Sequence, residues 1–134
     1  MAYPRILLAD DHQKMLKTVA HLLESKFEIV AAAEDGLRTI EEAERVDPDV
    51  LVLDISMPIM NGLDAAFFLR GSGCRGRIIF LTVHHDRDFV ETAFSAGALG
   101  FVLKSHLATD LMPAIQEVLL GHTFVSPSLK SAEP

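Results

Sequence analysis

Residues 5–11 read RILLADD, a short apolar run that ends directly in two aspartates. A run of this length, without alternation of apolar and polar residues, is typical of a strand buried on both faces of a parallel sheet. Four similar runs follow along the chain, at residues 27–32, 50–53, 77–81 and 100–103. The sequence therefore predicts five strands of one parallel sheet.

Amphipathic segments separate the five apolar runs. In each segment apolar residues recur at spacings near three and four, as in a helix that packs by one face. Three glycines are expected to follow helix ends in the left-handed conformation: Gly71, Gly97 and Gly121. Strands that alternate with helices in this way predict an α/β fold built on a parallel sheet.

The composition indicates one globular domain and argues against several classes of partner. The chain has 134 residues, with 12 basic and 19 acidic residues and a formal net charge of −7. It has no cluster of basic residues for nucleic acid or an anionic membrane surface. Cys74 is the only cysteine, which excludes an internal disulfide, and no apolar run approaches the length of a membrane span. We expect a reduced, cytoplasmic protein.

Polar side chains follow four of the predicted strands. Asp10 and Asp11 follow the first, Asp54 the third, Thr82 the fourth and Lys104 the fifth. The carboxyl ends of parallel strands share one edge of a sheet, where binding sites form. Converging carboxylates need a counter-charge, and oxygen ligands suit Mg²⁺. An aspartate at such a site can attack phosphorus, while lysine and threonine can contact phosphoryl oxygens. The sequence therefore predicts a Mg²⁺ and phosphoryl site.

Residues 4–121 resemble a response-regulator receiver domain of two-component signalling. The resemblance rests on five motifs in order: residues 9–12 (ADDH), 53–58 (LDISMP) with Asn61 and Gly62, 81–82 (LT), 97–98 (GA) and 100–104 (GFVLK). It implies a flavodoxin-like, doubly wound, five-stranded sheet with strand order 2-1-3-4-5. We expect the receiver domain to span residues 1–121 and a C-terminal tail, or the start of a linker, to span residues 122–134.

The resemblance assigns a role to each residue at the predicted site. Asp54 matches the phosphoacceptor. Asp11 matches a direct Mg²⁺ ligand, Asp10 a ligand that acts largely through water, and Ser56 a position whose backbone carbonyl binds the metal. Lys104 matches the lysine that contacts the phosphoryl group.

Thr82 and Phe101 match the switch pair of receiver domains. In that pair the hydroxyl moves toward the phosphoryl group and the aromatic ring turns inward. Phe101 stands where tyrosine is commoner, and Val83 is bulkier than the small residue usual after the switch threonine. Ser56 and His84 occupy the two positions that tune the lifetime of the phosphoryl group in receiver domains.

The expected function is that of a regulatory phosphoacceptor, not an enzyme acting on other substrates. A sensor histidine kinase or a phosphotransfer protein is the expected donor, and a phosphorylation-dependent homodimer is a possible product. Residues 121–127 (GHTFVSP) resemble the segment that follows the receiver in LuxR-type helix-turn-helix transcription factors, so control of transcription is expected if the chain is part of a longer regulator. A stand-alone receiver is the alternative. Candidate output contacts are Phe101, Leu107 and Leu111, and the alternative for some of them is a place in the core.

Two other functions fit parts of the pattern. A Mg²⁺-dependent phosphatase similar to haloacid dehalogenases would use Asp54 as nucleophile, but it needs a second aspartate two residues later, where Ser56 stands. A flavodoxin-like electron carrier would need hydroxyl groups and glycines after the first strand, where two aspartates stand. Of the minor features, His84, His85 and Asp86 favour a solvated loop over a metal site, and Cys74 lacks a neighbouring base.

Overall fold

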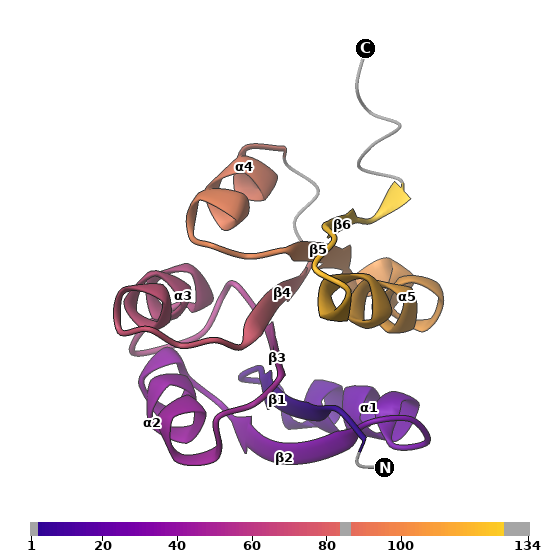
Figure 1. The fold of residues 1–134 in the computed structure, drawn as a ribbon, viewed down its shortest axis with the longest axis horizontal. Helices are drawn as coiled ribbons and strands as arrows, with labels where there is room; N and C mark the ends of the chain where they lie inside the picture. The colour runs from indigo at the N-terminus through magenta and orange to yellow at the C-terminus, as the bar shows by residue number, and fades with distance from the viewer. Residues whose placement is uncertain (1–2, 84–86, 128–134) are drawn as a thin grey trace.

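The computed structural model describes residues 3–83 and 87–127, which form one sheet between two layers of helices (Figure 1). The strands run in the order β2-β1-β3-β4-β5-β6, and every adjacent pair is parallel. Their bounds are β1 (Arg5–Ala9), β2 (Glu28–Ala33), β3 (Val50–Leu53), β4 (Arg77–Thr82), β5 (Gly100–Leu103) and β6 (Phe124–Val125). The predicted strand order is confirmed, with a short sixth strand added at one edge.

Helices cover both faces of the sheet, as a doubly wound fold requires. The first face carries α2 (Gly36–Val46), α3 (Gly62–Gly71) and α4 (Arg87–Ser95). The second face carries α1 (Gln13–Leu23) and α5 (Leu107–Leu119), with the short 3-10 helix η1 (Lys104–His106) before α5. Side-chain caps fix two helix starts: Asp35 accepts the Arg38 amide at α2, and Asn61 accepts the Asp64 amide at α3.

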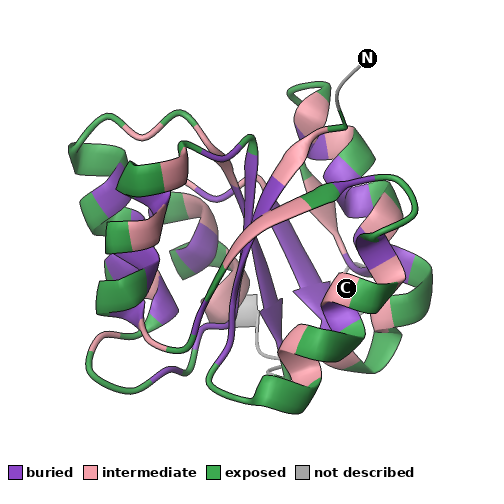
Figure 2. Cartoon of the chain, turned by 90° about the horizontal axis from the view of Figure 1, so that it is seen from below, coloured by how far each residue is buried: buried purple, intermediate pink, exposed green. Residues whose placement is uncertain are grey.

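The central strands lie in the core, which explains why their residues do not alternate. In β3, Leu51 and Leu53 pack toward α2 and α3, while Val50 and Val52 pack toward α1 and α5. All four are at most 2% exposed. Figure 2 shows these buried strands between helices whose outer sides are exposed. A strand buried on both faces is apolar at every position.

The strand order brings the ends of β1 and β3 side by side. Ala9 and Leu53, the last residues of the two strands, are partners in the ladder. The Asp54 amide continues this pairing by donating to the Ala9 carbonyl at 2.9 Å. Asp10 and Asp54 therefore follow paired residues at the switch point of the sheet, where ligands of such folds bind.

Two glycine positions agree with the prediction and one does not. Gly97 and Gly121 have φ of 96° and 86°, in the left-handed region predicted for them. Gly71 is the last residue of α3, and Gly73, with φ of 88°, takes the left-handed conformation in its place. The helix therefore includes Gly71, and the left-handed residue follows two positions later.

The C-terminal segment adds β6 to the sheet edge. Phe124 and Val125 pair with Gly100 and Phe101 of β5. Residues 122–134 were expected to form a tail or linker, and a strand of two residues is too short to produce a periodic signal in sequence. The residue after this strand, Ser126, is fully buried.

Two of the predicted output contacts belong to the core. Phe101 packs among the residues of the α2–α4 side and Leu111 among those of the α1–α5 side, and both are 0% exposed. Leu107 is only partly buried. Phe101 and Leu111 are therefore unavailable as surface contacts in this conformation. Within residues 3–83 and 87–127, no helix combines the length and apolarity needed to cross a bilayer.

Gly62 holds α3 against the backbone of Asp54. Its amide donates to the Ile55 carbonyl at 2.8 Å, and a Cβ at this position would lie 2.1 Å from the Asp54 carbonyl oxygen. A methyl group there would displace either α3 or the segment that carries Asp54. Gly71, at the other end of α3, would place a Cβ in open space.

We therefore predict that Gly62→Ala lowers the free energy of unfolding by about 1–3 kcal/mol, as overpacking does in other cores. Gly71→Ala serves as the control on the same helix and should change stability by less than about 1 kcal/mol. Urea unfolding followed by circular dichroism measures both. Equal stability of the two variants would show that the close contact of Gly62 with Asp54 is not a constraint.

Candidate functional site

Two buried aspartates form the base of the site. Asp10 follows β1 and is 3% exposed, while Asp54 follows β3 and is 5% exposed. The Asp10 amide is tied to Ala33 of β2 and the Asp54 amide to Ala9 of β1, so the sheet fixes both backbones. Asp11, one residue farther along, is exposed. Two carboxylates are thus held away from water beside a third that reaches solvent.

Lys104 supplies the counter-charge. It follows β5 and opens η1, and its side chain is 10% exposed. Its Nζ lies 2.8 Å from Asp10 Oδ2 and 3.3 Å from Asp54 Oδ2, and it donates a hydrogen bond to the second of these. One ammonium group therefore lies between two buried carboxylates, and the site keeps an excess of negative charge.

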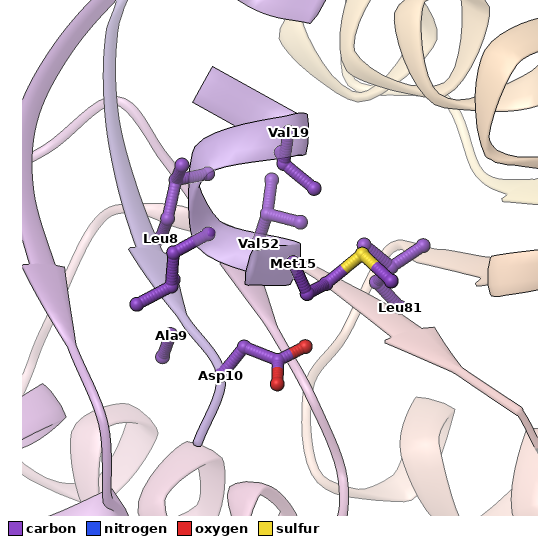
Figure 3. A pocket seen from close by; sticks show the side chains of 8 residues that line it. Leu8, Ala9, Asp10, Met15, Val19, Val52 and Leu81 are labelled. Atoms are coloured by element: carbon purple, nitrogen blue, oxygen red, sulfur yellow. The ribbon is translucent and has the colours of Figure 1, made fainter. Parts of the chain in front are cut away.

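Asp10 Oδ2 is incompletely satisfied. Its approach to Lys104 is an ion pair, yet within the described part of the chain this buried oxygen receives no hydrogen bond of good geometry. Its surroundings offer little else. Figure 3 shows its carboxylate beside Met15 and Leu81. Asp10 is the one charged residue among the described, otherwise apolar side chains that line a cavity of about 10 Å³. That volume holds at most one water molecule. A buried carboxylate oxygen in this state favours a cation.

Burial and the neighbouring charges shift the pKa values of Asp54 and Lys104. Burial raises the pKa of Asp54, and the neighbouring Asp10 carboxylate raises it further, against the attraction of Lys104 and a bond from the Ser56 amide. For Lys104, burial acts to lower the pKa. The contact with Asp10 and the charges of the two carboxylates outweigh burial, so the pKa of Lys104 is raised. Lys104 stays charged, and ionisation of Asp54 is less favourable in the folded protein than in an exposed aspartate.

The residues at this edge could hold a metal ion. Asp10, Asp11, His12 and Asp54 each offer a ligand atom, and these atoms lie within 4.8 Å of one another. Three of the four donors are carboxylate oxygens, which suit a hard divalent cation. The poorly satisfied Asp10 Oδ2 is an observation in favour of the same fit. The cluster is therefore chemically suited to a cation of the Mg²⁺ type.

His12 contributes to the site more than its sequence position indicated. It stands immediately before α1. Its amide donates to Asp10 Oδ1 at 2.9 Å, and its Nδ1 lies 3.1 Å from Asp10 Oδ1 and 3.0 Å from Asp11 Oδ1. The only signal in the sequence was its place directly after the acidic pair.

Of the other predicted residues, Thr82 and Ser56 lie at the same edge, and Phe101 lies within a strand. Thr82 ends β4, is fully buried and is the ladder partner of Leu103, the residue before Lys104. Ser56 is exposed, and its amide lies 3.3 Å from Asp54 Oδ1. Phe101 lies in β5 with its ring fully buried.

Three predicted features remain. Val83, after Thr82, is 63% exposed. His84, His85 and Asp86 fall outside the residues that the structure describes. Cys74 is half-buried in the loop before β4, at the opposite end of the strands from the acidic residues. It therefore takes no part in the site.

Comparisons with known proteins agree with this geometry. The family model described as response regulator receiver domain matches residues 6–116. The nitrate/nitrite response regulator protein NarL of Escherichia coli is 37% identical over 126 residues, which cover 92% of this chain and 58% of NarL. The chain spans 54–62% of the length of three curated relatives, NarL among them.

Solved structures give the same result. A two-component response regulator of the LuxR family from Aurantimonas superposes with a TM-score of 0.92 and 31% identity, covering 97% of this chain and 94% of that one. The isolated receiver domain of RcsB from Salmonella enterica, solved with the phosphomimetic BeF₃⁻, gives a TM-score of 0.88 at 25% identity, covering 96% and 97%. With the family model matching most of the chain, this protein belongs to the response-regulator receiver family of two-component signalling.

Proposed function

We propose that Asp54 is the phosphoacceptor of this receiver domain. The observation that carries the proposal is the position of its carboxylate, 3.3 Å from the Lys104 ammonium and beside the acidic pair. A phosphoryl group on Asp54 would meet Lys104 as a fixed positive charge, which stabilises the negative charge that develops during transfer. The raised pKa of Asp54 shows that its charge is poorly stabilised by the protein alone.

Mg²⁺ is the cation that we assign to the acidic cluster. Asp11, which is exposed, would bind it directly, and the buried Asp10 would act largely through water. Asp54 would contribute a carboxylate oxygen and Ser56 its backbone carbonyl. The ion would supply positive charge to the phosphoryl oxygens, and the choice of Mg²⁺ over other cations follows from its preference for carboxylates, water and phosphate.

Thr82 and Phe101 are the residues that we assign to the conformational response. Thr82 ends β4, the strand paired with β5, so this residue lies at the edge where a phosphoryl group would stand. Phe101 has no hydroxyl to hold it at the surface, and its ring is already inward. We therefore infer that the response depends on movement of Thr82 and β5 more than on rotation of the ring.

The expected partners are proteins. A histidine kinase or phosphotransfer protein in the cytoplasm would donate the phosphoryl group, and the receiver would catalyse only its own phosphorylation and dephosphorylation. The relatives include transcriptional regulators, and one solved structure contains RcsB dimers bound to DNA. By analogy we propose that phosphorylation promotes a homodimer and controls transcription through a LuxR-type DNA-binding domain, with no nucleic-acid contact by residues 1–134 themselves.

Replacement of Asp54 tests the acceptor assignment. Beryllofluoride with Mg²⁺ should bind the wild type and not Asp54→Asn, because an amide cannot form the acyl-phosphate-like adduct. Acetyl phosphate with Mg²⁺ should add the mass of one phosphoryl group to the wild type and not to Asp54→Asn. Asp64→Asn, which alters an exposed aspartate on α3, is the matched control and should behave as the wild type. Fluorine NMR and intact-protein mass spectrometry give the two readouts, and phosphorylation of Asp54→Asn would refute the assignment.

Replacement of Lys104 tests the balance of charge. Because its ammonium occupies the carboxylates that a cation would use, Lys104→Met should raise Mg²⁺ affinity by about tenfold, which corresponds to about 1.4 kcal/mol. The same variant should bind beryllofluoride more weakly, since a contact to the phosphoryl group is lost. Asp11→Asn should weaken Mg²⁺ binding.

Lys26→Met is the control for the loss of one positive charge, because Lys26 is exposed and lies in the turn after α1. Its effect on Mg²⁺ affinity should be less than about twofold at physiological ionic strength. Isothermal titration with Mg²⁺ compares the four proteins. Unchanged or weaker Mg²⁺ binding by Lys104→Met would contradict a competition between the ammonium group and the metal.

A further inference from the structure

Ser126 forms a buried junction between three elements. It follows β6, is 0% exposed, and its amide donates to the Phe101 carbonyl of β5 at 3.0 Å. Its Oγ accepts the Leu103 amide at 3.0 Å and donates to Asp110 Oδ2 of α5 at 2.8 Å. One side chain therefore joins the last residue of β5 to the first turn of α5.

The Leu103 amide needs this partner. β6 has two residues, and its ladder with β5 ends at the pair Phe101–Val125. The short strand therefore offers no backbone acceptor to the Leu103 amide. A buried amide without a hydrogen-bond partner destabilises the fold. The Ser126 hydroxyl takes the place of the missing strand carbonyl.

Asp110 completes the junction from the other side. It is 8% exposed and lies in the first turn of α5, where the helix dipole favours a negative charge. It accepts from Ser126 through Oδ2 and from the Thr109 hydroxyl through Oδ1, at 3.1 Å. The hydroxyl of Ser126 thus donates one hydrogen bond, to Asp110, and accepts one, from the Leu103 amide.

The junction is adjacent to the phosphorylation site. Leu103 precedes Lys104, whose Nζ contacts Asp10 and Asp54, and on the other edge of β5 Leu103 is paired with Thr82. Any movement of the β5 end that follows a change at Lys104 or Thr82 must strain or relax the bond from the Leu103 amide to Ser126. The same bond holds the segment Phe124–Ser126 against the sheet.

We propose that Ser126 is a positioning residue for Lys104. By holding the Leu103 amide and Asp110 together, it fixes the strand end from which Lys104 reaches the site, and it couples occupancy of Asp54 to the segment Phe124–Ser126. This proposal rests on the proposed function of Asp54. The segment Phe124–Ser126 thereby gains a role in transmitting the signal. This role is not predicted by the sequence, which indicated a tail or linker there.

The first test uses the wild type. If occupancy of Asp54 is coupled to the Ser126 junction, binding of beryllofluoride must change the stability of the junction. Amide hydrogen exchange of residues 1–134 is measured by NMR with Mg²⁺ alone and with Mg²⁺ plus beryllofluoride. The Leu103 and Ser126 amides should change their exchange rates by about fivefold or more, the lower end of typical coupling. The Asp47 amide, bonded to Ala43 at the end of α2, is the internal control and should not change.

The second test is the variant Ser126→Ala. Beryllofluoride affinity, measured by NMR titration at constant Mg²⁺, should fall by about fivefold or more, because Lys104 is no longer held in place. Ser72→Ala is the control. It also removes a serine hydroxyl that bonds within the chain, to the Leu69 carbonyl at 3.0 Å, but at the C-terminal end of α3. Its beryllofluoride affinity should stay within about twofold of the wild type.

The outcomes separate the two proposals. If the wild type binds no beryllofluoride, the assignment of Asp54 and the role of Ser126 fall together. If the wild type binds it, and exchange at Leu103 and Ser126 is unchanged or Ser126→Ala binds as tightly as the wild type, only the role of Ser126 is overturned. If Ser126→Ala does not fold, the exchange measurement on the wild type decides.

Discussion

The structure depends on one charge interaction, that of the Lys104 ammonium with the carboxylates of Asp10 and Asp54. Both carboxylates are almost fully buried, and unpaired buried charges are among the most destabilising features that a fold can contain. One ammonium cannot balance the acidic residues gathered there. Since the pKa of Asp54 is raised, the folded protein holds the proton of this carboxyl more tightly than the unfolded chain does. In the metal-free protein, the stability cost of ionising Asp54 is therefore absent at low pH and appears as the pH rises through the raised pKa.

The fold makes this interaction possible and also limits it. The reversal of strand order places the ends of β1 and β3 side by side, and β5 brings Lys104 from two strands away. The backbones are fixed by the ladder, by the contact of Gly62 with Asp54 and by the Ser126 junction at the end of β5. An added cation or phosphoryl group thus meets carboxylates and one ammonium whose backbone positions are set by the sheet.

Most of the fold could be predicted because its strands are buried on both faces, which leaves unbroken apolar runs in the sequence. Residues 5–9, 50–53 and 100–103 were placed without error for this reason. The acidic site could be predicted because parallel strands place the residues that follow them at one edge. Features that depend on contacts in three dimensions could not be predicted from the sequence. The contacts of His12, the burial of Phe101 and Leu111, and the bonds of Ser126 each depend on a neighbour that is distant in sequence or on a side-chain direction. β6 pairs with β5 through its backbone, and a strand of two residues is too short to give a periodic pattern in the sequence.

The most direct test of this account is the titration of the Asp54 carboxyl group itself, followed by carbon-13 NMR of the side-chain carboxyls in the metal-free protein. The structure predicts that Asp54 titrates above the ordinary range of an aspartate, because burial and Asp10 outweigh the attraction of Lys104. It also predicts that saturating Mg²⁺ shifts this titration to lower pH, because the added positive charge favours the carboxylate. An Asp54 that titrates at or below the ordinary range without metal, and does not respond to Mg²⁺, would contradict the claim that this site carries an unbalanced negative charge.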